Sequence, residues 1–330
     1  MENLSQATIR NNTETCDVSW FKFYIIQLYI IPLISLIGFS TNLLCTIIFI
    51  SVIKKLKSNH GVMHHYFLAK SITDLIVFVV TAMSPLYFCK SCSASTHIMA
   101  NIWFKFFYNF GEEAMILCSA TFQIASLVDC YLSLSCSSKL CTVKTFKLLS
   151  VFTISLSLIL SLVILFRFEI VQVNEPYLNS TTTKYIIEKT LFYESNIDTY
   201  LRFLQTVLRD YVTLLLMIIC SLLIIVSMKN LMNKKKVLSG DASKLIKLKR
   251  KVVSSMAISS LIYIIGHIPL CIYYLPFDKN STFWYCYYSY SLVPFYSSYI
   301  FGFFIYLKYN KNFKACFFKL VSSMMFRFRK

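Results

Sequence analysis

The stretch FYIIQLYIIPLISLIGFSTNLLCTIIFISVI, residues 23–53, contains no Asp, Glu, Lys or Arg. A run of about 20 apolar residues is long enough to cross the hydrocarbon core of a bilayer as a helix. This stretch therefore predicts a membrane-spanning helix. The composition of the whole chain agrees, because 57% of its 330 residues are hydrophobic and only 15% are charged. That is too few charges for the surface of a water-soluble globule.

Six further apolar stretches of similar length follow the first one. They cover residues 66–88, 106–128, 148–166, 211–228, 252–277 and 281–307, and only the first two of these contain Asp, Glu, Lys or Arg. The sequence thus predicts an all-α membrane protein built as a bundle of seven transmembrane helices. Its parts are an extracellular segment (1–22), the seven-helix domain (23–309) and an amphipathic helix with a tail (310–330). We recognise no cleavable signal peptide, so the first span is expected to direct insertion.

The charges predict that the N-terminus lies outside the cell. In this orientation, 22 of the 33 Lys and Arg residues fall in the inner loops and the tail, as the positive-inside rule requires. The four N-glycosylation sequons all fall outside, at Asn3, Asn11, Asn179 and Asn280. The net charge of +18 therefore belongs to the inner face of a plasma-membrane glycoprotein, in contact with anionic lipid. It is not the basic patch of a nucleic-acid-binding protein.

Five short motifs occur in an order and spacing that resembles the rhodopsin-like (class A) G-protein-coupled receptors. They are GFSTNLL (38–44), FLAKSITDL (67–75), SLVDCYLSL (126–134), GHIPL (266–270) and GFFIYLKYNKNFKACF (302–317). The resemblance covers residues 25–318 and is greatest to invertebrate neuropeptide receptors of the FMRFamide type. It implies a receptor that couples an extracellular ligand to a heterotrimeric G protein. The residues it places in activation and coupling motifs are Asn42, Asp74, Asp129, Tyr131 and Tyr306, with the bend of the sixth span at Pro269.

The chain also departs from the pattern of that family. Cys130 stands where the family has the arginine of its Asp-Arg-Tyr motif, and His267 stands where it has a tryptophan. Asp129 would then need another cation, and Lys70 or Lys139 are the options. The loss of the arginine leaves two interpretations open, a divergent receptor that still couples and a non-signalling decoy receptor. The family's disulfide at the top of the third span is also missing, because Lys105 stands near the place of its cysteine.

A second group of residues is predicted in the middle of the membrane. In the family, the positions of Asp74, Ser119 and Ser298 surround a sodium ion. Here Lys70 lies four residues before Asp74, so the two side chains share a helix face and can pair. The ammonium would supply the positive charge that a desolvated carboxylate needs. The alternative is that Lys70 extends to the membrane surface and pairs with nothing.

The ligand is expected at the outer ends of the helices. The resemblance places Glu112 at a ligand-contacting position, and a carboxylate among aromatic side chains attracts a cation. The adjacent Glu113 is a further candidate. The alternative for Glu112 is an exposed, hydrated end of a helix. The other candidate ligand residues are His267, Trp284 and Tyr288, although most aromatics at the top of the seventh span fit an interfacial belt equally well.

The second outer loop favours a peptide as the ligand over a small cationic molecule. Residues 168–189, FEIVQVNEPYLNSTTTKYIIEK, read as two β-prone runs around a polar turn, which predicts a hairpin lid. In the family, such a hairpin accompanies peptide ligands. The acidic outer loops would suit a basic or amidated peptide.

The cysteines predict modifications rather than a metal site. The resemblance implies a disulfide between Cys16 and Cys286, while Cys89 and Cys92 could be bridged or free. Cys316 lies on the amphipathic segment of the tail and is a candidate for palmitoylation. We find no metal-ligand cluster, no cofactor motif and no catalytic constellation, and we therefore do not expect an enzyme. A transporter is a weaker alternative, because the sequence shows no internal repeat.

Overall fold

The structure, a computed structural model, describes residues 25–55, 62–89, 93–135, 142–177, 180–235, 241–275 and 282–328. Within these residues, seven helices are long and apolar enough to cross a membrane. They are Ile26–Lys55, Met63–Phe88, Ile98–Ser135, Val143–Phe166, Asn196–Asn233, Arg250–Tyr273 and Tyr287–Tyr309. The chain is therefore a multi-pass membrane protein with a helical bundle, as the apolar stretches predict.

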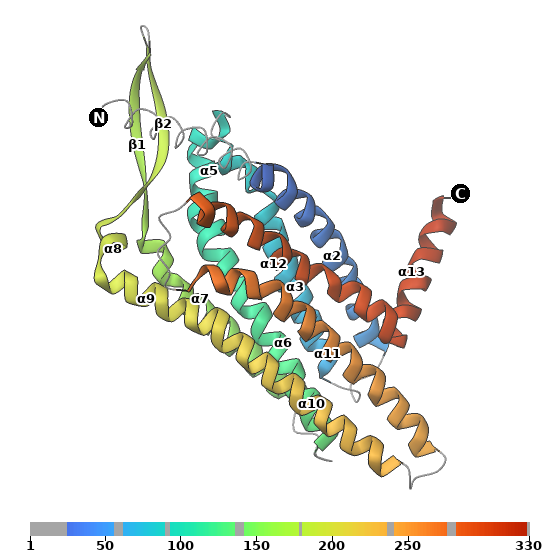
Figure 1. Cartoon of the computed structure of the whole chain (residues 1–330). Helices are drawn as coiled ribbons and strands as arrows, with labels where there is room; N and C mark the ends of the chain where they lie inside the picture. Colours follow the sequence, from blue (N-terminus) through green and yellow to red (C-terminus); the bar gives the residue numbers. More distant parts are fainter. Residues whose placement is uncertain are drawn as a thin grey trace, which may run out of the picture.

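Six of the helices form a closed ring. The helices α2 (Ile31–Lys55), α3 (Met63–Ala82), α6 (Glu112–Ser135), α10 (Thr213–Lys235), α11 (Asp241–Tyr273) and α12 (Thr282–Tyr309) pack in this order, and α12 packs back on α2 (Figure 1). The remaining long helix, α7 (Val143–Leu162), belongs to the fourth span and packs on α6 outside the ring. Its buried face carries the small residues Thr153, Ser157 and Ser161, which allow the helices to approach closely.

One end of the bundle carries a β-hairpin, and we call it the hairpin end. Strands β1 (Phe168–Tyr177) and β2 (Ser180–Lys189) pair antiparallel, with Phe168 opposite Lys189. The hairpin predicted from residues 168–189 is thus confirmed. It projects past α5 (Ile98–Ile102) and away from the helices, instead of lying across their ends as a lid (Figure 1).

Two helices extend further at the hairpin end than their apolar stretches predict. The third long helix begins at Ile98 rather than near residue 106, and the fifth begins at Asn196 rather than at Tyr211. Charged residues interrupt the apolar pattern before the fifth span, but the protein itself neutralises them. Asp198 is fully buried and binds Arg167 (Nε to Oδ1, 2.7 Å) and Arg202 (Nε to Oδ2, 2.9 Å).

Four shorter elements complete the hairpin end. They are α4 (Pro85–Phe88), the 3₁₀ turn η2 (Ser93–Thr96), α8 (Leu191–Glu194) and α9 (Asn196–Thr206). A further 3₁₀ turn, η4 (Val163–Phe166), ends the fourth span. Three of the long helices also contain π-helical stretches near this end: η1 (Ile26–Ile30), η3 (Trp103–Gly111) and η5 (Val207–Val212). Such stretches occur often at functional sites, and η3 and η5 flank the acidic residues described below.

The opposite end carries the amphipathic helix predicted after the seventh span. Helix α13 (Lys311–Phe328) begins two residues after α12 ends and packs on both α12 and α2 (Figure 1). Phe313 anchors it, fully buried, with its ring 5.1 Å from the ring of Phe49 and 5.8 Å from that of Tyr306.

Candidate functional site

The predicted pair of Lys70 and Asp74 is formed in the middle of the bundle. Both residues lie on α3, one helical turn apart, and Lys70 Nζ is 2.5 Å from Asp74 Oδ2. The ammonium also lies 5.0 Å from the centre of the Tyr299 ring. The hydroxyl of Ser119, on α6, donates a hydrogen bond to the other carboxylate oxygen, Asp74 Oδ1. Lys70 therefore points into the bundle and does not extend to the membrane surface.

These contacts do not fit a sodium ion. Lys70 occupies one oxygen of the Asp74 carboxylate and Ser119 donates to the other. A second cation would also meet the repulsion of the ammonium group. Ser298 lines the same cavity, but its hydroxyl donates to Phe295 O of its own helix at 2.7 Å. We conclude that the lysine provides the positive charge at this place.

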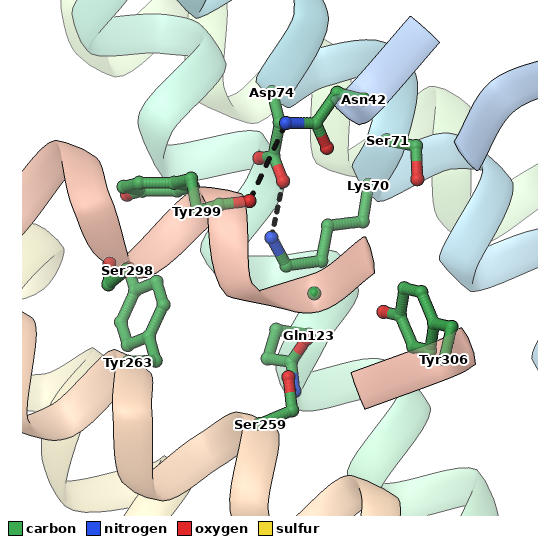
Figure 2. Close-up of a pocket in the computed structure, with 11 residues that line it drawn as sticks. Asn42, Lys70, Ser71, Asp74, Gln123, Ser259, Tyr263, Ser298, Tyr299 and Tyr306 are labelled. Atoms are coloured by element: carbon green, nitrogen blue, oxygen red, sulfur yellow. Dashed lines mark hydrogen bonds and ion pairs between the residues drawn. The ribbon is translucent and has the colours of Figure 1, made fainter. Parts of the chain in front are cut away.

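A small polar cavity surrounds the pair, between α2, α3, α6, α11 and α12 (Figure 2). Asn42 closes one side, because its Nδ2 donates to Gly38 O (2.9 Å) and to Tyr299 O (3.5 Å). Gln123 and Ser259 lie on the other side, with Gln123 Nε2 3.4 Å from Ser259 Oγ. Gln123 Oε1 has no hydrogen-bond partner among the residues that the structure describes.

A second charged cluster lies in the half of the bundle toward the hairpin end. Arg209 of η5 is buried, and its guanidinium donates to Glu113 of α6 and to both oxygens of Asp210 (2.9 and 2.7 Å). Its central carbon is 5.3 Å from the centre of the Tyr274 ring. The arginine therefore links the third, fifth and sixth helices. Sequence reasoning did not select Arg209 or Asp210, although two adjacent ionisable residues at the edge of an apolar span were a usable signal.

Glu112 belongs to this cluster but has a different environment. Its side chain is only 4% exposed, and Glu112 Oε1 accepts hydrogen bonds from the hydroxyls of Tyr296 and, at 3.4 Å, Thr81. Within the described part of the chain, no Lys or Arg lies within ion-pair distance of it. The alternative interpretation of Glu112 as a hydrated helix end is therefore wrong. Tyr296 was not predicted as a partner of Glu112, because the two residues lie 184 positions apart in the sequence.

His267 lies beside the Lys70–Asp74 pair. Its ring stacks on Tyr263 with 3.6 Å between centroids, and its Nδ1 is 2.8 Å from Tyr263 O. Its Nε2 lies 3.2 Å from the hydroxyl of Tyr299, whose ring faces Lys70. A chain of contacts thus runs from Lys70 through Tyr299 to His267. Pro269 lies inside α11, two residues after His267.

The other two predicted ligand residues lie nearer the end of the bundle. The ring centroid of Tyr288 is 4.8 Å from that of Tyr273, and that of Trp284 is 6.4 Å from it. Both side chains are half-buried where α12 meets the end of α11.

The coupling motif of the resemblance lies toward the opposite end. Cys130 is buried, Asp129 and Tyr131 are half-buried, and Tyr306 is buried with its ring 4.8 Å from that of Phe67. The hypothesis that Lys70 is the cation for Asp129 is wrong. Lys70 binds the same carboxylate as Ser119, and Asp129 lies ten residues further along α6, about 15 Å away.

The cysteines show one feature that the sequence did not reveal. Cys316 is buried, and its Sγ lies 3.3 Å from Lys55 Nζ on α2. Its palmitoylation stays a prediction, and it would require α13 to move from α2. Cys89 takes part in a disulfide bond. The sequons at Asn3, Asn11, Asn179 and Asn280, Lys139 and Cys16 lie outside the described residues, as does the side chain of Cys286.

The arrangement can hold positive charge from outside the chain. Near the hairpin end, the cluster contains three buried or half-buried carboxylates, and its one guanidinium pairs with Glu113 and Asp210 but not with Glu112. An excess of acid in a site of low polarity favours a cationic group over an anion or a neutral molecule. No group of three or more His, Cys, Asp or Glu side chains in the described ranges could hold a metal ion. No protein-family model matches the sequence, and no curated protein matches it.

Proposed function

We propose that this protein is a plasma-membrane receptor of the rhodopsin-like, G-protein-coupled class, with a peptide as its ligand. The observation that carries the proposal is the vertical order of the two charged clusters inside the ring. The acid-rich cluster faces the hairpin end, where a ligand enters, and the Lys70–Asp74 pair lies in the middle. Helix α12 reaches both, because Tyr296 binds Glu112 and Tyr299 lies beside Lys70 and His267.

The proposed mechanism begins with a cationic group of the ligand at Glu112. This carboxylate is bonded only to the hydroxyls of Tyr296 and Thr81 within the described residues, and a basic group of the peptide supplies the missing charge. Movement of Tyr296 on α12 also moves Tyr299, which lies about one turn further along the same helix. Tyr299 then changes its contacts with His267 and Lys70, and the helices rearrange toward the opposite end. A heterotrimeric G protein binds there, where the basic residues gather.

A non-signalling decoy receptor is the second candidate, and one observation favours it. Cys130 is a buried, uncharged residue at the position where the resemblance places the arginine that contacts the G protein. A cysteine cannot supply a fixed positive charge or the reach of an arginine. A decoy would bind the peptide at the same site and stay silent.

Second-messenger assays separate these candidates. The full chain is expressed in a reporter cell and exposed to a library of synthetic basic, C-terminally amidated peptides, with read-outs for each G-protein class. We expect a peptide that signals through the wild type, and a loss of its potency of at least about tenfold in Glu112→Gln. Binding without any signal supports the decoy. If no peptide binds and none signals, both candidates are contradicted.

A further inference from the structure

Among the residues that the structure describes, the hairpin has one covered edge and one open edge. The Nδ2 of Asn101, a buried residue of α5, donates to Tyr185 O on β2 at 3.0 Å. At the base, the hydroxyl of Thr190 donates to Phe166 O at 2.6 Å, and Arg167 is fixed by Asp198. The hairpin is thus held at its base and along β2. In Figure 1, β2 lies on the side of α5 and β1 on the far side.

The register shows which main-chain groups of β1 point outward. Thr190 N–H donates to Arg167 O at 3.0 Å, so the odd-numbered residues of β1 exchange hydrogen bonds with β2. In an antiparallel pair the residues between them direct N–H and C=O away from the partner strand. Those residues are Ile170, Gln172 and Asn174. Within the described residues, no hydrogen bond to these outward main-chain groups is formed.

An isolated two-stranded hairpin in water is only marginally stable. Its free edge is a template for an added strand, because a third chain satisfies the unpaired groups. We propose that the outer edge of β1 binds an extended peptide as a third strand, and that this peptide carries a basic residue opposite Glu169 and apolar residues opposite Val171 and Val173. This inference rests on the proposed peptide ligand and places one segment of it.

Charge decides between a peptide and a second copy of this chain. Glu169 lies directly opposite Glu188, and both side chains are exposed. Like charges at this place disfavour the hairpin, and a basic residue on an added strand relieves them. The strand FEIVQVNEPY contains two acids and no Lys or Arg. Pairing of two β1 strands would therefore bring like charges together, whereas a basic peptide brings opposite ones.

The heptapeptide Lys-Thr-Val-Thr-Val-Thr-Lys amide is a suitable probe. It is symmetric, so a lysine can face Glu169 and valines can face Val171 and Val173 in either strand direction. Binding of the fluorescent peptide to the purified full chain in lipid nanodiscs is measured by anisotropy. Hydrogen exchange at Ile170, Gln172 and Asn174 is measured in parallel, and we expect the peptide to slow it at these three amides.

Three variants make the test specific. Gln172→Pro removes an outward N–H of β1 and should weaken binding at least about tenfold. Gln172→Ala keeps the main-chain groups and should bind as the wild type does. Thr183→Pro makes the same change on the opposite edge and should also bind normally, which controls for damage to the hairpin. A peptide with glutamates in place of its lysines should bind more weakly.

The proposal is overturned if the peptide does not bind, or if it binds the wild type and Gln172→Pro equally. A wild-type dimer that Gln172→Pro converts to a monomer overturns it in favour of a second copy. The signalling assay is separate from these results. A library peptide whose potency Gln172→Pro leaves unchanged would support the receptor and contradict the edge site. Binding of the probe at β1 in a chain that never signals would support the edge site and contradict the signalling receptor.

Discussion

At the scale of single residues, the Lys70–Asp74 pair stabilises the protein only while both members are present. A buried ion pair is strongly destabilised by the loss of one partner, by about 3–5 kcal/mol, because the other charge is left without compensation. Asp74→Asn should therefore lower thermal stability in detergent and surface expression. The double variant Lys70→Met with Asp74→Asn should recover a large part of this loss.

Ser119→Ala is the matched control for that pair. It removes only the hydrogen bond to Asp74 Oδ1, which is worth about 1–3 kcal/mol to a charged acceptor. Equal loss of stability in Asp74→Asn and in the double variant would contradict the pairing.

Arg209 has a more central role in its cluster than either of its partners. Arg209→Gln leaves Glu113 and Asp210 without their guanidinium, so we expect a loss of about 3–5 kcal/mol. Glu113→Gln should cost less, since Asp210 still holds the arginine through two hydrogen bonds. Thermal unfolding of the two purified variants checks the order. A larger effect of Glu113→Gln would show that Asp210 does not hold the arginine alone.

The residue scale also shows what spacing along one helix can predict. Lys70 and Asp74 are four residues apart, so the sequence is enough to place them together. The contacts of Glu112 with Tyr296 and of His267 with Tyr299 join different helices or depend on the rotation of each helix. Ser298 illustrates the same limit, because it lines the predicted cavity while its hydroxyl turns to its own helix. No local pattern determines these orientations.

At the scale of elements, the packing of α11 on α12 depends on Gly266. A Cβ added there would lie 2.6 Å from Ser298 Cβ and 2.8 Å from the main-chain oxygen of Pro294. Because the oxygen belongs to the backbone, the helices would have to separate. Gly266→Ala should cost about 1–3 kcal/mol of the free energy of unfolding, measured by thermal unfolding in detergent.

Gly302→Ala on α12 provides the control. The nearest atom to its added Cβ is Tyr306 Cε2, at an ordinary 3.6 Å. Alanine also favours a helix interior over glycine by about 0.5–1 kcal/mol. We therefore expect unchanged or slightly higher stability. If both variants lost equal stability, the close approach at Gly266 would not be the cause.

The elements were predicted well where composition alone decides. Charge-free apolar runs placed the spans, and β-prone runs around a turn placed the hairpin. The start of the fifth helix was missed because its charged residues resemble a loop in the sequence, and the third helix was predicted to begin only after Lys105. Asp198 is compatible with a helix only because Arg167, from the end of the preceding span, neutralises it together with Arg202. That pairing depends on tertiary structure.

At the scale of the whole molecule, the proposed orientation places the hairpin outside the cell. It predicts glycans at Asn179 or Asn280, which a shift in mobility after glycosidase treatment would detect. It also predicts that trypsin cleaves near Lys234, at the end of α10, only in permeabilised cells. Cleavage near Lys234 in intact cells would show that the chain has the opposite orientation.

In the proposed receptor, Cys130 is the residue expected to limit communication with a G protein. Cys130→Arg introduces a permanent guanidinium beside Asp129 at the end of the bundle opposite the hairpin. Residues 244–253 of the sixth helix read KLIKLKRKVV, and this stretch contains no acid to hold that group at rest. A receptor that couples weakly should therefore gain basal or ligand-driven signalling, measured in a reporter cell at matched surface expression. Cys130→Met, which adds bulk without charge, should not.

The decoy candidate predicts a different result for the same pair of variants. A chain that has lost coupling at several positions stays silent whichever residue occupies this one, so Cys130→Arg and Cys130→Met should both resemble the wild type. If signalling rose equally in both, bulk at a buried position would be the cause, because only the arginine carries charge. A gain in Cys130→Arg alone would locate the weakness of coupling in the missing guanidinium, and it would do so without requiring the natural ligand.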